Sequence, residues 1–264
     1  MPMPDSLKKW HNFNEWLCKT NFSFLQGASH PVDIVERANH LGYGSICIND
    51  FDGVYGLARS YRELDYLVKQ GQHSGTCLHY GAEIHLSQDH SLPILLQNTL
   101  VLIARNLNGY GNLNRILSDC HRDGKDNAFI DLERLSEFSR DDLIAIQPMR
   151  GLIRYRHEMT DYDAIHSLFP GCYYLTINRC MHPAEDCWIK PTLAIARKFN
   201  LNTLISQDVF MHNRDQKYMS DLLHAIRRNK VIHECPQDFF PNGERCLHTA
   251  EELDRLYRDI PGVD

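Results

Sequence analysis

Apolar residues along the chain alternate between two spacings. Short, mostly apolar runs such as 45–50 and 143–146 have the length and composition of buried strands. Between such runs, apolar residues recur every three or four positions, as in Val54, Leu57 and Tyr61, which is the spacing of an amphipathic helix. This alternation predicts an α/β fold in which helices cover a mostly parallel sheet or barrel.

Residues that start and stop helices define individual elements. Pro31 suits the first position of a helix and Gly42 its end, and Ile34 and Ala38 lie on one apolar face between them. The helix that begins near Val54 has a natural stop at Gly71. The same reasoning predicts strands over 15–20, 77–86, 95–104, 172–177 and 203–205, and helices over 113–120, 191–199 and 219–227.

The length of 264 residues and the 43% hydrophobic content suit one large domain with a substantial core. From Val231 onward the chain is richer in turn residues, with prolines at 236, 241 and 261. We therefore expect a main domain over 1–230 and a C-terminal tail over 231–264.

Charge and cysteine content narrow the class of protein. The net charge of −6 disfavours a protein that grips a nucleic-acid backbone by itself. Nine cysteines without a Cys-x-x-Cys pair fit reduced thiols better than a disulfide framework. No apolar run approaches the length of a membrane span, and the start at Met1 lacks the order of a secretory signal. These features predict a soluble, cytoplasmic protein with no membrane contact.

Six stretches follow one another along nearly the whole chain: NFSFLQGAS at 21–29, INDFDG at 48–53, GAE at 81–83, ARNLNGYGNL at 104–113, SQDVFMH at 206–212 and AIR at 225–227. Together they resemble the polymerase-and-histidinol-phosphatase (PHP) domain of bacterial DNA polymerase III alpha subunits, above all the error-prone branch. The resemblance implies a distorted seven-stranded (β/α) barrel with a cluster of divalent metals at its mouth, held mainly by His, Asp and Glu. It makes 1–230 the PHP barrel domain and 231–264 a tail that leads towards a polymerase palm, a region beyond the end of this chain at Asp264.

Most of the metal ligands that the resemblance implies are replaced. Leu17 and Lys19 stand where the family has a His-x-His pair, and neither suits a cationic metal site. Gln26 takes the place of an aspartate, and Phe51 that of a histidine. The remaining replacements are Met149, at a Cys or His position near the middle of the barrel, and Phe210, at the histidine of a late Asp-x-His.

Glu83, His121 and Asp208 keep a competent ligand type at positions aligned with the family. Three ligands can hold one ion together with water, so a Zn or Mn site remains the alternative. Because the paired ligands are the ones lost, we expect no metal and no other cofactor. A vacant site also predicts that Glu83→Gln costs little stability, since no bound ion would be lost.

Other candidate groups have simpler interpretations. Asp50, like Glu83 and Asp208, follows or ends a strand, where a lone carboxylate most often caps a helix or stabilises a turn. A zinc site can be drawn from His233, Cys235, Cys246 and His248, and a looser group from Cys172, Cys180, His182 and Cys187, but neither has the spacing of a common zinc motif.

The resemblance and the replaced ligands together predict a non-catalytic scaffold domain of an error-prone DNA polymerase III alpha subunit. Its partner would be the polymerase catalytic region, and its contact with DNA would be indirect. The main alternative is a residual metal-dependent phosphoesterase or 3′–5′ exonuclease that acts through Glu83, His121 and Asp208. A folded remnant of a broken gene is a third possibility.

Overall fold

A seven-stranded sheet, in which every strand pairs with the next along the chain, forms the centre of the structure. All neighbouring pairs are parallel except the two pairs made by β4, which runs antiparallel to β3 and β5. The computed structural model describes residues 9–88, 90–124, 127–150, 161–182, 186–235 and 239–260. The strands are β1 (Asn14–Cys18), β2 (Ser45–Ile48), β3 (Cys77–His85), β4 (Thr99–Ala104), β5 (Leu143–Gln147), β6 (Tyr173–Ile177) and β7 (Asn202–Ile205).

The sheet closes on itself just beyond its last strand. Val209, which follows β7, forms an isolated parallel bridge with Cys18 at the end of β1. The amide of Lys19 donates to the Val209 carbonyl over 2.8 Å, and the amide of Val209 donates to the Leu17 carbonyl over 2.7 Å. The predicted distorted seven-stranded barrel of the α/β class is thereby confirmed, with its closure made by a loop rather than by β7 itself.

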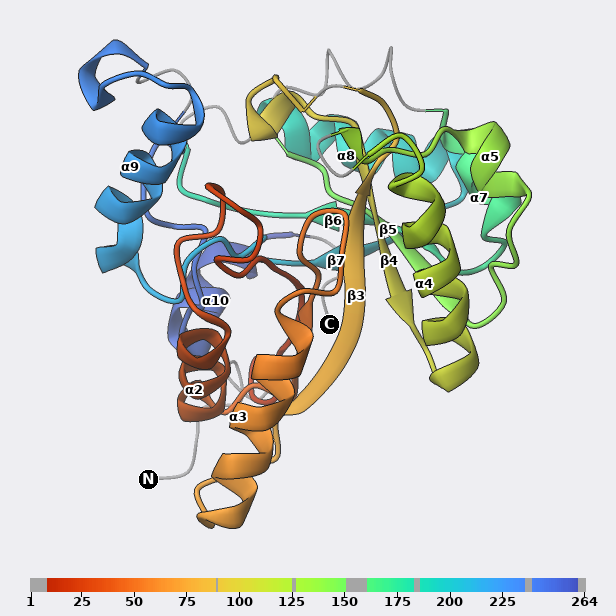
Figure 1. Ribbon diagram of the computed structural model, residues 1–264. Coiled ribbons are helices and arrows are strands. Elements are labelled where there is room, and N and C mark those ends of the chain that lie inside the picture. The colour runs from red at the N-terminus through yellow and green to blue at the C-terminus, as the bar shows by residue number, and fades with distance from the viewer. Residues whose placement is uncertain are drawn as a thin grey trace.

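Helices cover the outside of this barrel. Helices α2 and α3 lie on one side of the long strand β3, and α4, α5 and α7 lie on the other (Figure 1). None of the helices in the described ranges has both the length and the apolar character to cross a lipid bilayer. Their bounds are α2 (Pro31–Leu41), α3 (Leu57–Lys69), α4 (Leu107–Cys120), α5 (Leu132–Ser136), α7 (Tyr162–Leu168), α8 (Asp186–Phe199), α9 (Lys217–Arg227) and α10 (Ala250–Tyr257), with short 3₁₀ turns at Ile94–Leu96, Arg214–Gln216 and Ile232–Glu234.

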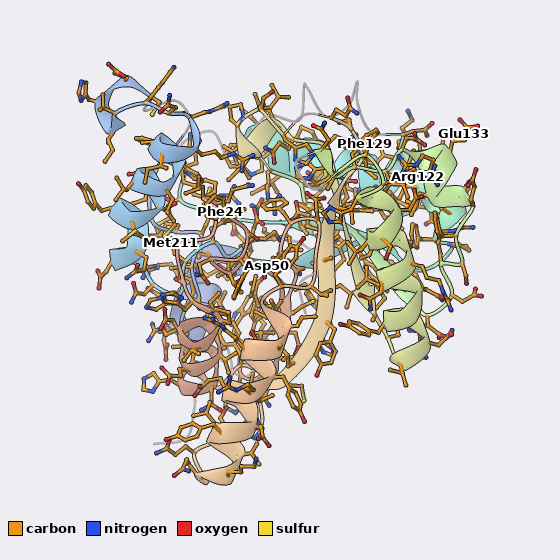
Figure 2. The ribbon with its side chains drawn as sticks, viewed as in Figure 1. Phe24, Asp50, Arg122, Phe129, Glu133 and Met211 are labelled. Atoms are coloured by element: carbon orange, nitrogen blue, oxygen red, sulfur yellow. The ribbon has the colours of Figure 1, made fainter. Side chains whose placement is uncertain are left out.

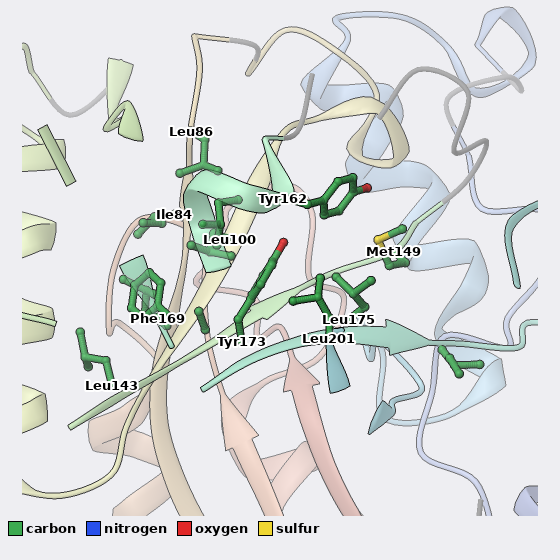
Figure 3. Close-up of a cluster of buried hydrophobic side chains, with 14 of the residues drawn as sticks. Ile84, Leu86, Leu100, Leu143, Met149, Tyr162, Phe169, Tyr173, Leu175 and Leu201 are labelled. Carbon is green, nitrogen blue, oxygen red and sulfur yellow. The ribbon is translucent and has the colours of Figure 1, made fainter. Parts of the chain in front are cut away.

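Several buried apolar clusters hold the barrel together. A small cluster that includes Leu17, Val101 and Ile146 is buried separately from the larger one. A much larger cluster packs β3 to β6 against the surrounding helices and includes Tyr173 and Leu175, which Figure 3 shows among their neighbours. Burying a side chain of this size stabilises the fold by roughly 1.5 to 3 kcal/mol. The barrel therefore does not depend on a metal for its core.

Capping residues explain where several helices begin and end. Helix α2 starts at Pro31 and ends before Gly42, whose φ of 73° is left-handed, as the sequence predicts. Helix α4 begins at Leu107, earlier than predicted, because the side chain of Asn106 accepts from the amide of Gly109. Helix α8 begins at Asp186, before the predicted start, and accommodates Pro191 inside its first half.

Two further predicted segments have a different kind of structure over part of their length. The strand predicted over 95–104 begins only at Thr99, because Ile94–Leu96 form a 3₁₀ turn. The tail predicted to consist of turns contains α10, whose Leu253, Leu256 and Tyr257 are buried in the large core cluster. The described part of the tail therefore packs on the barrel, whereas Pro236, Pro261 and both chain ends lie outside the described residues.

Candidate functional site

Charged side chains converge where the strands leave one end of the barrel. Lys19 directly follows β1, Glu83 lies near the end of β3, Arg150 comes after β5, and Asp208 comes after β7. These four residues are at most 1% exposed, and Arg245 from the tail joins them at 3%. We call these five residues the mouth cluster. Asp208 adopts a left-handed φ of 52°, an unusual conformation for a residue with a side chain.

Arg150 bridges the two carboxylates of the mouth cluster. Its Nε and Nη2 donate to Oδ2 and Oδ1 of Asp208, each over 2.6 Å. Its Nη2 also donates to Oε2 of Glu83 over 2.8 Å, and its Nη1 donates to Oε1 of the same residue. Two paired, charge-assisted interactions of this kind are strong and fix the guanidinium plane.

The other two cations complete the pairing. Lys19 Nζ lies 2.7 Å from Oε2 of Glu83 and donates to Oδ1 of Asn49 over 2.6 Å. Arg245 donates from Nη1 to Oδ2 of Asp208. Three protein cations therefore surround two buried carboxylates.

The electrostatics of the mouth cluster follow from this pairing. Burial by itself would raise the pKa of Glu83, but the charges of Arg150 and Lys19 outweigh it and hold that pKa well below its usual range. For Asp208, Arg150 and Arg245 likewise outweigh burial and lower its pKa. Nearby Glu15 differs, because burial raises its pKa to about 7 despite hydrogen bonds from Ser206 and Gln207.

Aromatic rings occupy two positions where the family resemblance implies histidines. The Phe51 ring centroid lies 5.2 Å from Lys19 Nζ and 5.8 Å from the guanidinium carbon of Arg150. The Phe210 centroid lies 5.2 Å from the same guanidinium carbon. The rings form apolar walls with a favourable cation–π geometry.

The mouth cluster does not fit a divalent metal cluster. A metal ion binds a carboxylate through the lone pairs of its oxygens. Here the carboxylate oxygens of Glu83 and Asp208 already accept hydrogen bonds from Lys19 and Arg150. A divalent ion placed beside Lys19 and Arg150 would also be repelled by them.

The structure separates the three predicted ligand residues. Glu83 and Asp208 are brought together by Arg150, but the Nε2 of His121 forms its 2.7 Å hydrogen bond with the backbone carbonyl of Asp52. His121 lies at the C-terminal end of α4, beside the loop that follows β2. Only two of the three are thus joined in one cluster.

The structure also shows what surrounds three of the residues that stand in place of family metal ligands. Gln26 is buried, and its Oε1 has no hydrogen-bond partner among the described residues. Leu17 belongs to an apolar cluster with residues of β2, β4 and β5. Met149 packs in the large core beside Leu175 (Figure 3), so the residue from this segment that enters the mouth cluster is its neighbour Arg150.

Asp50 stabilises the loops around the barrel end. Its carboxylate accepts from the amide of Thr20 over 2.7 Å, the hydroxyl of Ser23 over 2.7 Å and the amide of Gly56 over 2.9 Å. Figure 2 shows Asp50 on the same side of the molecule as Met211, whereas Arg122, Phe129 and Glu133 lie beside α4 and α5. These contacts show that Asp50 stabilises the loop after β1 and the start of α3.

Sequence reasoning missed Arg150 and Arg245 as residues of this site. A single arginine carries no local signal, and its partners are distant in the sequence: Glu83 lies 67 positions and Asp208 58 positions from Arg150. The feature that could have pointed to them is charge balance, because two buried carboxylates without a metal need cations.

A second polar cluster, also missed, lies beside the first. Asp52, His85 and His90 bring ligand atoms within 4.8 Å of one another, and across the described ranges this is the only such group of three or more His, Cys, Asp or Glu. The two groups around Cys235 and Cys187, set aside as zinc sites because of their sequence spacing, do not meet that criterion within the part of the chain that is described. His248 instead contacts Gln207 and Glu244 through its two ring nitrogens.

Comparison with known proteins relates the chain to one family. The family model described as the PHP domain matches residues 17–171. The error-prone DNA polymerase of Anaeromyxobacter dehalogenans strain 2CP-1 is 28% identical over 262 residues, covering 94% of this chain and 21% of that protein. The error-prone DNA polymerase of Pseudomonas aeruginosa is 30% identical over 249 residues, covering 93% and 22%. The chain thus spans about a fifth of the length of these relatives.

Solved structures with a similar arrangement have little sequence identity to this chain. A protein from Bifidobacterium adolescentis, described as a metal-dependent phosphoesterase, has a TM-score of 0.49 at 13% identity, covering 75% of this chain and 88% of that one. An amidohydrolase from Chromobacterium violaceum has a TM-score of 0.46 at 11% identity, covering 75% and 87%.

Proposed function

This chain belongs to the PHP domain family, and we propose that it is a non-catalytic scaffold domain of an error-prone DNA polymerase III alpha subunit. The observation that carries the proposal is the placement of Arg150 between Glu83 and Asp208. With Lys19 and Arg245, it supplies from the protein the positive charge that divalent metals supply in an active site. The barrel mouth then holds no metal and carries out no hydrolysis.

A scaffold role needs the barrel but none of its ligands. The large apolar core and the closure of the barrel at Cys18 and Val209 are independent of the mouth cluster's chemistry. We propose that the barrel domain over 1–230 supports a polymerase catalytic region in DNA synthesis or repair in the cytoplasm, with the segment 231–264 leading towards the palm. The similarity to error-prone polymerases over 94% of the chain supports this context.

The proposal predicts that the purified chain has no hydrolase activity. With Mn²⁺ or Zn²⁺ added, it should hydrolyse neither a phosphomonoester such as p-nitrophenyl phosphate nor the 3′ end of a DNA strand. Arg150 holds both candidate acidic ligands, so no metal-bound hydroxide can form between them. The measurement is the release of nitrophenolate and of nucleotides, with Asp208→Ala as the matched control at the same background rate. A metal-dependent rate that Asp208→Ala abolishes would instead support the phosphoesterase or exonuclease alternative.

The scaffold proposal also predicts the partner. We expect the chain to form a complex with a catalytic fragment of an error-prone polymerase, measured in a pull-down at physiological salt. Direct binding to primer–template DNA should be weak and salt-sensitive, because a net charge of −6 disfavours contact with phosphates. Tight DNA binding together with no affinity for the catalytic fragment would overturn the scaffold role.

A further inference from the structure

The cluster of Asp52, His85 and His90 lies outside the set of positions to which the family resemblance assigns metal ligands. Asp52 follows β2, His85 is the last residue of β3, and His90 lies in the connection between β3 and β4. Asp52 and His85 are buried and His90 is partly buried. The Phe51 ring centroid lies 5.5 Å from that of His85 and 5.2 Å from Lys19 Nζ, so this ring contacts both the second cluster and the cations of the mouth cluster.

His85 faces a hydrogen-bond acceptor at each of its two ring nitrogens. Its Nδ1 lies 2.8 Å from Oδ2 of Asp52, and its Nε2 lies 3.1 Å from Oε1 of Gln97. The orientation of Gln97 is fixed, because its Nε2 donates to the carbonyl of Leu92 over 2.9 Å. A neutral imidazole has only one N–H, so it cannot donate to both acceptors. Either a second proton or a metal ion on one nitrogen resolves this conflict.

The other two residues are also positioned as ligands commonly are. His90 Nε2 lies 2.8 Å from the carbonyl of Ala128, which can only accept, so Nε2 carries the proton and Nδ1 the lone pair. Asp52 uses Oδ1 to accept from the amide of His85 over 3.1 Å, which directs Oδ2 towards the imidazole. Metal-binding histidines typically donate their second ring N–H to a carboxylate, a backbone carbonyl or a water. The Ala128 carbonyl has this place beside His90, and the amide oxygen of Gln97 has it beside His85.

One divalent ion can bind all three side chains at once. The ring centroids of His85 and His90 are only 3.9 Å apart, so a single ion can contact both rings. It would be shared by two neutral imidazoles and the Asp52 carboxylate. Two nitrogens and one oxygen are a typical zinc ligand set, with water in the fourth position.

We propose that Asp52, His85 and His90 bind one Zn²⁺ ion, through Oδ2 of Asp52 and Nδ1 of each histidine. In this arrangement His85 Nε2–H donates to Gln97 and His90 Nε2–H donates to Ala128, so every polar group of the site is satisfied. The ion clamps the loop after β2, the end of β3 and the β3–β4 connection together. It is structural, and it is independent of the scaffold function proposed for the barrel mouth.

Zinc binding by the full chain and by matched variants tests the site. The protein is stripped with chelator and titrated with ZnCl₂, and bound zinc per chain, melting temperature and the visible spectrum of the Co²⁺-substituted form are measured. The test variants are His90→Gln, at a partly buried loop position, and Asp52→Asn, since asparagine tolerates the left-handed φ of 53° at this position. His73→Gln is the control, because His73 is a loop histidine that likewise contacts a backbone carbonyl, that of Thr76, outside the cluster.

We expect one zinc per chain and a higher melting temperature with zinc in the unmodified protein and in His73→Gln. Affinity should fall at least about tenfold in His90→Gln and Asp52→Asn, since losing even a group that hydrogen-bonds to a metal ligand typically costs about that much. The proposal is overturned if the unmodified chain retains no stoichiometric zinc at micromolar concentrations, or if both test variants bind as it does. Absence of zinc would leave the scaffold proposal standing, whereas two metals per chain with hydrolase activity would contradict the scaffold proposal.

Discussion

Replacing Arg150 with methionine is expected to lower the free energy of unfolding by roughly 3 to 5 kcal/mol, the cost of removing one partner from a buried ion pair. Arg150 is among the largest fully buried side chains, and it donates four hydrogen bonds to Glu83 and Asp208. Methionine fills much of the same volume but offers no donors, so oxygens of both carboxylates would be left buried without these partners. Urea denaturation at pH 7 gives the free energy directly.

The matched control is Arg122→Met. Arg122 also forms an ion pair, with Asp119, but its side chain is 62% exposed, so its loss should cost less than about 1 kcal/mol. Lys19 and Arg245 still pair with one carboxylate each in Arg150→Met, and the variant should therefore remain folded at 25 °C. Equal stabilities of the two variants would show that Arg150 is not the cation on which the mouth cluster depends.

Local signals in the sequence were sufficient for much of the barrel. The helix from Pro31 was predicted with both ends because proline and glycine act at the backbone of single residues. The strands over 77–86 and 143–146 were predicted to within a residue at each end, because their buried runs are continuous. Such elements need no knowledge of distant partners.

Elements that depend on distant contacts were harder to predict. The turn at Ile94–Leu96 is as apolar as a strand, and its side chains reach a separate buried cluster beside Phe240 rather than the sheet. Tertiary packing determined this turn, and packing cannot be read from a window of neighbours. Helix α10 differs, because its capping box at Thr249 and Glu252 is a local signal that sequence reasoning overlooked. The barrel covers the apolar face of this short helix.

The candidate site, too, could be predicted only in part from the sequence. The loss of ligand chemistry at Leu17, Phe51 and Phe210 was visible residue by residue once the family resemblance was clear. The cations that pair with Glu83 and Asp208 were not visible in the sequence, because Arg150 and Arg245 reach these carboxylates through long side chains from segments far apart in the chain. The triad of Asp52, His85 and His90 likewise forms only where the loop after β2 meets the end of β3.

Glu83→Gln is expected to destabilise the protein by roughly 3 to 5 kcal/mol, because it leaves buried cations without their counter-charge. The sequence alone, which suggested a vacant site, predicted almost no cost. In the structure Glu83 pairs with both Lys19 and Arg150, and its Oε1 also accepts from the hydroxyl of Thr99 over 2.5 Å. Glutamine would leave three cations beside a single ionised carboxylate, that of Asp208, and would turn an amide N–H₂ towards one of the cations.

Asp65→Asn is the matched control, since it makes the same acid-to-amide change in a surface pair with Lys69, where the side chains are 42% and 69% exposed. Its cost should stay below about 1 kcal/mol. Adding Lys19→Met to Glu83→Gln should recover part of the loss, because it removes one of the uncompensated charges, and a double-mutant cycle from urea denaturation measures that coupling. A cost for Glu83→Gln no larger than that of Asp65→Asn, with no coupling to Lys19, would mean that the carboxylate of Glu83 is not held by these cations in solution and that the barrel mouth is open to a metal ion after all.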